Sequence, residues 1–405
     1  MKIVMIAPFS VYPKGTVPIR MLPIAENLVK RGNFVEIVVP PYDNPSESGR
    51  QYCINGVKIS NVNFINLPII KYFATLSGLL RRIFSVRPNL VYIFKPKGYS
   101  GLAAASLAML RRLGLLKNTA IILDTDDWEG RGGFADYFKK QSIYPQIMLN
   151  FFDFQEQWIP RHMDAITVAS RALESKLLSE GIAPNKIFYV PNGKPDRNFD
   201  VPEQEVKALK TSLGLTNVPV ILLYTRFFEF KLEKVVDVLK CIKQSIPDVK
   251  LLVVGKGEFG EEKELVRLAS NQGLGNSVVF SGWINSIDIP KYLALGDIAI
   301  YPFDDTPLNR AKCPGKLIEL MNARRAIVAD DVGQIREYIQ NGKSGLLADY
   351  KNTAQFAALV IKVLNDDNLK KTLATNSGKR INEAFNWCML TNIVELALSQ
   401  ARRVK

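Results

Sequence analysis

Short apolar runs that alternate with helix-length segments are the feature of this sequence that most restricts its fold. Residues 2–6, 34–39 and 90–94 are apolar runs of strand length, and residues 20–31 have the apolar spacing of a helix. Strands alternating with helices are typical of a parallel, doubly wound α/β sheet. The first half of the chain is therefore predicted to open with a strand–helix–strand unit.

A second series of the same kind begins near the middle of the chain. Residues 220–224 and 250–254 are again apolar runs, and they follow a polar, proline-interrupted segment at residues 195–218 that suits an interdomain linker. A chain of 405 residues is long for one domain and comfortable for two. We therefore expect two α/β domains.

Composition narrows the class of protein and its compartment. The chain has four cysteines without metal-like spacing and a single histidine, His162, which argues against a zinc site or a disulfide framework. The first residues are too short and too strand-like for a signal peptide, and no run approaches the about 18 apolar residues that a membrane span needs. We expect a cytoplasmic protein that is at most peripheral on the inner face of the membrane.

The formal net charge of +14 favours an acidic partner. Nucleic acid is not expected, because the basic residues are spread out and no RNA-binding or helix-turn-helix motif is present. Residues 71–87 form a basic, amphipathic segment with two open interpretations: a helix that lies on an anionic membrane surface, or one that packs on the sheet with its charges in water.

Residues 310–347 carry the strongest candidate binding site. Pro314 and Gly315 suit the start of a helix, where free N–H groups favour an anion, and Lys312 and Lys316 bracket that start. Glu319 lies one turn further on, where a carboxylate could accept hydrogen bonds from hydroxyl groups. Phosphate at a helix end with a ribose on a carboxylate would suit a nucleotide diphosphate; a solvated amphipathic helix is the alternative.

The same stretch resembles the donor-site motif of the retaining GT-B glycosyltransferases, in particular family 4. It matches the family pattern at Glu319, residues 326–329, Gly333, residues 337–339 and residues 342–347, and it departs at the first glutamate of the family's Glu-x7-Glu motif, where Ala311 stands. Residues 166–173 and 186–193 also resemble the end of the family's N-terminal domain, in the family's order and spacing.

This resemblance implies an α/β fold of the GT-B class, with two Rossmann-like doubly wound domains that face a central cleft. It implies an acceptor domain at residues 1–196, a nucleotide-sugar donor domain at residues 197–385 and a C-terminal helix at residues 386–405 that crosses back onto the first domain.

The resemblance also implies roles for residues at the donor site. Arg226 and Lys231 would act in catalysis by holding the donor diphosphate, although Thr225 and Leu232 stand where the family has glycines. The remaining donor-binding positions would be Gly15, Gly255, Trp283, Lys312, Gly315, Lys316 and Glu319.

An acidic loop, residues 124–130, follows the apolar run at residues 120–123. Since ligands in open α/β sheets bind outside the carboxyl ends of the strands, Asp126 or Asp127 could orient an acceptor hydroxyl. Acidic loops are more commonly just solvated, and the histidine that relatives often carry in this region is absent. The aromatic segment at residues 134–154 is expected either to form an acceptor-side lip or to pack in a core.

The function implied by the resemblance is the transfer of a hexose, with retention, from a UDP-sugar or GDP-sugar to a glycan or lipid-linked acceptor in envelope polysaccharide or glycolipid synthesis. No cofactor and no metal are expected, because cations can hold the diphosphate. A catalytically inactive glycosyltransferase-like binding protein, a GT-B sugar-nucleotide epimerase and a dinucleotide-dependent oxidoreductase are the alternatives.

Overall fold

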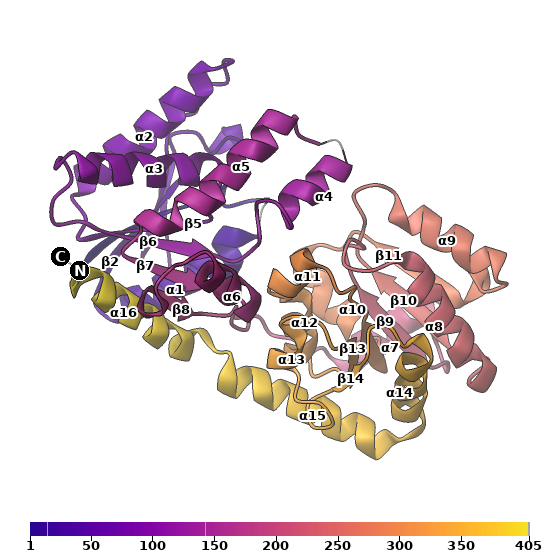
Figure 1. The fold of residues 1–405 in the computed structure, drawn as a ribbon. Helices are drawn as coiled ribbons and strands as arrows, with labels where there is room; N and C mark the ends of the chain where they lie inside the picture. The colour runs from indigo at the N-terminus through magenta and orange to yellow at the C-terminus, as the bar shows by residue number, and fades with distance from the viewer. Residues whose placement is uncertain (14, 142, 404–405) are drawn as a thin grey trace. The chain divides into compact units, whose positions relative to one another are not determined.

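The computed structural model describes residues 1–13, 15–141 and 143–403, which form two α/β units (Figure 1). The first unit comprises Met1–Gly193, Ala311–Cys313 and Trp387–Lys405, and the second comprises Lys194–Arg310 and Pro314–Asn386. Residue 142 of the predicted aromatic segment and residues 404–405 of the predicted last helix lie outside the described residues.

The first unit is built on an eight-stranded sheet of order β3-β4-β2-β1-β5-β6-β7-β8. Its described pairings are parallel except that of β3 with β4, which is antiparallel. The strands are β1 (Lys2–Ile6), β2 (Phe34–Val39), β3 (Gln51–Ile54), β4 (Val57–Asn61), β5 (Leu90–Phe94), β6 (Ala120–Thr125), β7 (Ala165–Val168) and β8 (Ile187–Tyr189).

The helices of the first unit cover both faces of this sheet. They are η1 (Val17–Met21), α1 (Leu22–Lys30), η2 (Pro45–Glu47), α2 (Ile70–Val86), α3 (Gly98–Arg112), α4 (Phe134–Lys140), α5 (Gln146–Trp158), η3 (Pro160–His162), α6 (Arg171–Ser179), η4 (Pro184–Lys186) and α16 (Trp387–Arg403). One apolar core lies between the sheet and α1 and α16, and another between the sheet and α2 and α3. Because both faces are covered, every side chain of β5 is buried, which explains its uninterrupted apolar sequence.

The second unit is built on a six-stranded parallel sheet of order β11-β10-β9-β12-β13-β14. Its strands are β9 (Val220–Tyr224), β10 (Lys250–Val254), β11 (Val278–Gly282), β12 (Ile298–Tyr301), β13 (Ile327–Asp330) and β14 (Leu346–Ala348). Its helices are α7 (Glu203–Ser212), α8 (Leu232–Ser245), α9 (Glu261–Asn271), η5 (Gly275–Ser277), η6 (Ser286–Asp288), α10 (Ile289–Leu293), α11 (Pro307–Ala311), α12 (Gly315–Asn322), α13 (Ile335–Tyr338), α14 (Thr353–Asn365) and α15 (Asp367–Ala384).

Both sheets reverse their strand order at the first strand of the unit. In the first unit the chain moves outward from β1 to β2 and β4, and then restarts on the other side of β1 with β5; in the second unit the same reversal lies between β9 and β12. Ligands of doubly wound sheets bind at such points, outside the carboxyl ends of the strands. The topology therefore marks one candidate site in each unit.

No helix among residues 1–13, 15–141 and 143–403 is both long enough and apolar enough to cross a membrane.

Candidate functional site

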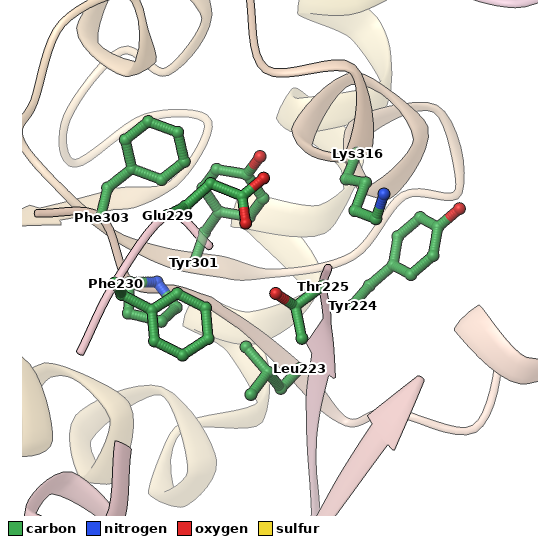
Figure 2. A pocket seen from close by; sticks show the side chains of 9 residues that line it. Leu223, Tyr224, Thr225, Glu229, Phe230, Tyr301, Phe303 and Lys316 are labelled. Atoms are coloured by element: carbon green, nitrogen blue, oxygen red, sulfur yellow. The ribbon is translucent and has the colours of Figure 1, made fainter. Parts of the chain in front are cut away.

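The second unit has a pocket at its reversal point, between the ends of β9 and β12 (Figure 2). Figure 2 shows Lys316 and Tyr224 on one side of it and Glu229, Phe230 and Phe303 on the other. The full set of lining residues is Leu223, Tyr224, Thr225, Glu229, Phe230, Tyr301, Pro302, Phe303 and Lys316. Lys316 comes from the first turn of α12, so the pocket also borders a helix N-terminus.

Glu319 lies beside this pocket, and two neighbours hold its carboxylate in place. The Tyr224 hydroxyl donates a hydrogen bond to Oε2 at 2.9 Å, and Arg197 Nη1 lies 3.4 Å from Oε1. Burial and the Glu319 charge both raise the pKa of Tyr224, so the phenol remains a donor. Lys316 Nζ lies 5.0 Å from the centroid of the Tyr224 ring. The structure thus brings together Lys316 and Glu319, two of the residues predicted from the sequence.

Arg226 and Lys231 lie on the loop between β9 and α8, and both are exposed. Arg226 is close enough to Tyr224 to act on its pKa, and Lys231 occupies the N-cap position of α8. Within the described part of the chain, neither side chain forms an ion pair or a hydrogen bond. Two exposed cations and the starts of α8 and α12 place positive charge at this end of the second sheet, which favours an anion there.

Gly255 is required where β10 ends against β9. Its φ is +126°, and a Cβ atom there would lie 2.1 Å from the Thr225 carbonyl oxygen. Its N–H points to the Gly282 carbonyl at 3.3 Å, at the end of β11. Trp283 follows β11 directly and is 68% exposed. Gly255 therefore shapes the backbone at the edge of the site, whereas Trp283 offers a free aromatic face.

A buried ion pair that the sequence reasoning missed supports the wall of the pocket. Lys234 Nζ lies 2.5 Å from Asp330 Oδ2 and donates to the Tyr350 carbonyl at 2.9 Å. The Phe303 N–H donates to the same Asp330 oxygen at 2.7 Å. Asp330 ends β13 and directly follows the predicted apolar run at residues 326–329, so this strand-end carboxylate was visible in the sequence, but its partner Lys234 was not.

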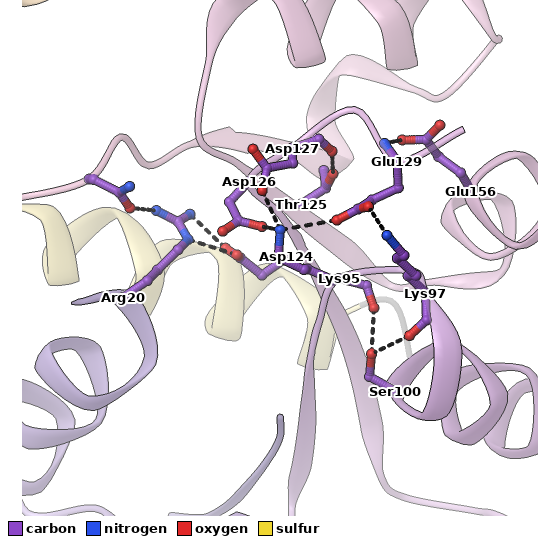
Figure 3. A network of polar contacts seen from close by, with 11 residues as sticks. Arg20, Lys95, Lys97, Ser100, Asp124, Thr125, Asp126, Asp127, Glu129 and Glu156 are labelled. Carbon is purple, nitrogen blue, oxygen red and sulfur yellow. Dashed lines mark hydrogen bonds and ion pairs between the residues drawn. The ribbon is translucent and has the colours of Figure 1, made fainter. Parts of the chain in front are cut away.

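The reversal point of the first unit holds a second polar cluster (Figure 3). Arg20 is fully buried, and it donates from Nε and Nη2 to the two Asp124 oxygens at 2.7 and 2.6 Å. Its Nη1 donates to Asn192 Oδ1 at 2.9 Å, and Thr167 donates to Asp124 at 2.6 Å. This network joins the helix after β1 to the ends of β6 and β7, and it fixes the start of the acidic loop.

Lys95, at the end of β5, gathers the rest of the acidic loop. Its φ is +63°, and its Nζ lies 2.9 Å from Asp126 Oδ1, 3.1 Å from Glu129 Oε1 and in contact with Asp127. Lys97 Nζ lies 2.7 Å from Glu129 Oε2. Figure 3 shows Lys95 in the middle of these carboxylates.

The charges in this cluster shift the pKa values of its members. Burial alone would lower the pKa of Lys95, but the three carboxylates outweigh burial and raise it. Burial raises the pKa of Asp127 to about 6 against the opposing charge of Lys95. Burial also opposes ionisation of Glu129, but Lys97 and Lys95 lower its pKa to about 2. Asp126 and Asp127 are therefore held by an ion-pair cluster and are not simply solvated.

The sequence reasoning included Glu129 in the acidic loop but missed Lys95 and Lys97 as its partners. A signal was available, because Lys95 and Lys97 follow a buried strand directly, at the same edge of the sheet as the acidic loop. The aromatic segment is mixed in character: Phe152 is buried, whereas Ile147 and Phe154 of the same helix are 80% and 54% exposed.

The remaining predicted positions are less closely tied to either cluster. Gly15 is half-buried and its carbonyl accepts a hydrogen bond from Ile19, which places it at the start of the helical turn η1. Lys312 belongs to the short segment Ala311–Cys313 of the first unit. An added Cβ at Gly315 would meet no atom within 4 Å, so the start of α12 is open. Among the described residues, no group of three or more His, Cys, Asp or Glu side chains is arranged to hold a metal ion.

Comparison with known proteins gives one family for both units. Residues 19–195 match the family model Glycosyltransferase Family 4, and residues 218–366 match Glycosyl transferases group 1. The chain is 22% identical over 405 residues to an uncharacterized glycosyltransferase of Methanocaldococcus jannaschii, MJ1607, and this alignment covers 96% of each chain.

Two further likenesses bear on the site and the fold. The chain is 26% identical over 225 residues to the N-acetyl-alpha-D-glucosaminyl L-malate synthase of Bacillus anthracis. This alignment covers 55% of this chain and 56% of that protein. The crystal structure of Anabaena HepE in complex with UDP has a TM-score of 0.71 at 17% identity and covers 98% of this chain and 100% of that chain. The family models match the two units in turn and the fold is shared, so the chain belongs to the family-4-like glycosyltransferases of the GT-B fold.

Proposed function

We propose that this glycosyltransferase moves a hexose, with retention, from a UDP-sugar or GDP-sugar to a hydroxyl of a glycan or lipid-linked acceptor in envelope polysaccharide or glycolipid synthesis. One observation carries the proposal: Arg226 and Lys231 are exposed at the end of β9 and have no side-chain partner among the described residues, beside a Glu319 carboxylate that Tyr224 and Arg197 already orient. Anabaena HepE, which shares the fold, binds UDP.

The cations would act on the charge that develops during transfer. When the bond between the sugar carbon and the phosphate oxygen breaks, its electron pair stays on the nucleoside diphosphate, which becomes more negative. Arg226, Lys231 and the open start of α12 at Gly315 could stabilise that charge, and preorganised donors of this kind are worth about 2.7–4 kcal/mol each. Lys312 and Lys316 would add positive charge, Glu319 would hold the ribose, and Gly255 and Trp283 would bound the nucleotide. These cations need no metal beside them.

The first unit would present the acceptor. Asp126 and Asp127 would accept a hydrogen bond from the acceptor hydroxyl and orient it, and Lys95 would keep both carboxylates at the carboxyl edge of the sheet. The Asp126 side chain is 12% exposed and the Asp127 side chain is 22% exposed, which leaves room for such a contact. The loop that contains Gly15 follows β1, and β1 is the neighbour of β5 in the same sheet.

Substitution of the two cations tests the proposed donor site. Arg226→Ala and Lys231→Ala should each lower turnover about a hundredfold or more without changing the melting temperature, because each removes one charge from the leaving group. Lys240→Ala is the matched control, since Lys240 is an exposed lysine on α8, away from the loop. Full activity of either site variant would refute the roles given to these residues.

A thermal-shift series with UDP, GDP, ADP and NAD, with and without EDTA, would identify the nucleotide. A ligand at a hundred times its dissociation constant stabilises the folded state by about 2.7 kcal/mol. A shift with one nucleoside diphosphate, unchanged by EDTA, would support a metal-independent donor site. A shift with NAD alone would contradict it.

A non-catalytic nucleotide-sugar-binding protein is the second candidate, and Ala311 favours it. This residue is fully buried and has no polar side chain, at the position where the family motif has a glutamate. Product formation separates the two candidates: donor binding without transfer or hydrolysis, over a panel of donors and acceptors, would support the binding protein.

A further inference from the structure

The first unit exposes an unusually apolar segment at the start of α2. We call residues 65–73 the apolar tip. Within it, Ile69 and Phe73 are each 70% exposed, and Leu67 and Ile70 are each 50% exposed. Ile65 and Tyr72 are also exposed. Soluble proteins seldom expose so many large apolar side chains together unless they bind a partner or a membrane.

The charged residues of the segment that contains the apolar tip and α2 are all basic, with Lys71 in the tip and three arginines at the far end of α2. Residues 62–87 contain Lys71, Arg81, Arg82 and Arg87 and no aspartate or glutamate. Arg82 pairs with Glu36, whereas Arg81 and Arg87 are exposed. Apolar side chains beside uncompensated basic ones are the combination that binds an anionic lipid surface.

The apolar tip is continuous with the edge of the sheet that carries the acidic loop. Four aromatic rings form a row: Phe9 and Tyr42 follow β1 and β2, Tyr99 begins α3, and Tyr72 belongs to the tip. Neighbouring ring centroids along this row are 6.5, 5.2 and 5.9 Å apart. Because Phe9 and Tyr42 mark the carboxyl ends of their strands, the tip lies at that same edge of the first unit (Figure 1).

We propose that the apolar tip docks on an anionic bilayer surface, with its apolar side chains among the lipid headgroups and Lys71 at the lipid phosphates. Docking would hold the carboxyl edge of the first sheet at the membrane, where a lipid-linked acceptor presents its hydroxyl; this last step rests on the proposed function. A second copy of the chain fits less well, because a symmetric contact through the tip would bring Lys71 close to its own counterpart.

Vesicle co-sedimentation tests the docking surface. The full chain should bind vesicles that contain phosphatidylglycerol more tightly than vesicles of phosphatidylcholine alone. The double substitution Ile69→Ser with Phe73→Ser should reduce binding by at least about tenfold, because both side chains are apolar and exposed. Lys71→Glu reverses one charge and should reduce binding to anionic vesicles by about thirtyfold at low salt.

The matched control is Leu113→Ser with Leu115→Ser. These leucines are 67% and 70% exposed, as much as the residues changed in the tip, but they follow the end of α3. The control should bind vesicles like the unchanged protein. The proposal is overturned if the tip variant binds vesicles as tightly as the unchanged protein, or if the control loses as much binding as the tip variant. It is also overturned if phosphatidylglycerol does not strengthen binding of the unchanged protein.

Two further measurements separate this proposal from others. If the unchanged protein sediments as a dimer that the tip variant loses, the tip is a self-association surface and the membrane proposal is wrong. Thermal shift with nucleoside diphosphates should be the same for the tip variant and the unchanged protein. In the unchanged protein, failure to bind anionic vesicles with intact nucleotide binding would refute only the membrane proposal, whereas vesicle binding without nucleotide binding would refute only the donor site.

Discussion

Gly255→Ala should destabilise the second unit well beyond the usual cost of replacing a glycine. The new Cβ would lie 2.1 Å from the Thr225 carbonyl oxygen, so β10 and β9 would have to separate at their carboxyl ends. Backbone strain at its φ of +126° costs about 1–3 kcal/mol, and forced separation of packed groups costs about 1–3 kcal/mol more. We expect a total loss of about 2–6 kcal/mol.

Gly273→Ala isolates the steric part of this loss. Gly273 also has a positive φ, +72°, but an added Cβ there would meet no atom within 4 Å. Only the backbone cost of about 1–2 kcal/mol should appear. Urea unfolding followed by circular dichroism compares the two variants, and hydrogen exchange in β10 localises the effect. If both variants lose the same free energy of unfolding, contact with the Thr225 carbonyl is not the reason that position 255 needs glycine.

Three further predictions concern single side chains. Arg20→Met should cost about 3–5 kcal/mol in urea unfolding, since it leaves the buried Asp124 carboxylate without its cation; a loss below about 1 kcal/mol would contradict this account. Burial raises the pKa of Glu156 to about 7 in the folded protein, above its ordinary value of 4.5. The stability that this group contributes is therefore fully present below pH 4.5 and is lost as pH rises through 7. Glu156→Gln should remove that part of the pH dependence. If the melting temperatures of the variant and of the unchanged protein change with pH in the same way, Glu156 does not cause it. Tyr224→Phe removes the hydroxyl that holds Glu319, so calorimetry should show donor nucleotide binding weakened about two- to tenfold, with turnover changed less; an unchanged dissociation constant would refute the positioning role.

The sequence was most informative where local patterns decide the structure. The strands Lys2–Ile6, Phe34–Val39, Leu90–Phe94 and Val220–Tyr224 were predicted with the bounds observed, because strands buried on both faces are nearly continuous apolar runs, interrupted here by Lys2 and Glu36. The GT-B fold and the glycosyltransferase family are confirmed. The antiparallel edge strand β3 was not predicted, since QYCI is short and its positions alternate between exposed and half-buried.

The side-chain partners at the sites could not be read from the sequence in the same way. Arg20 and Asp124 are 104 residues apart, and Lys95 reaches carboxylates more than 30 residues further along the chain. Such pairs depend on which strands become neighbours, and strand order is a property of the whole fold. For this reason the acidic loop was recognised as a candidate site, while the lysine that organises it was not.

The last helix, α16, has a consequence for how the protein is made. Its buried side chains Trp387, Leu390, Val394 and Leu398 pack in the same core as Ile3 and Met5 of β1. During synthesis the residues of the first unit leave the ribosome first, yet their apolar core stays open until residues 387–401 have followed. The nascent first unit must therefore wait, with part of its interior exposed to water and chaperones, while the whole second unit is translated.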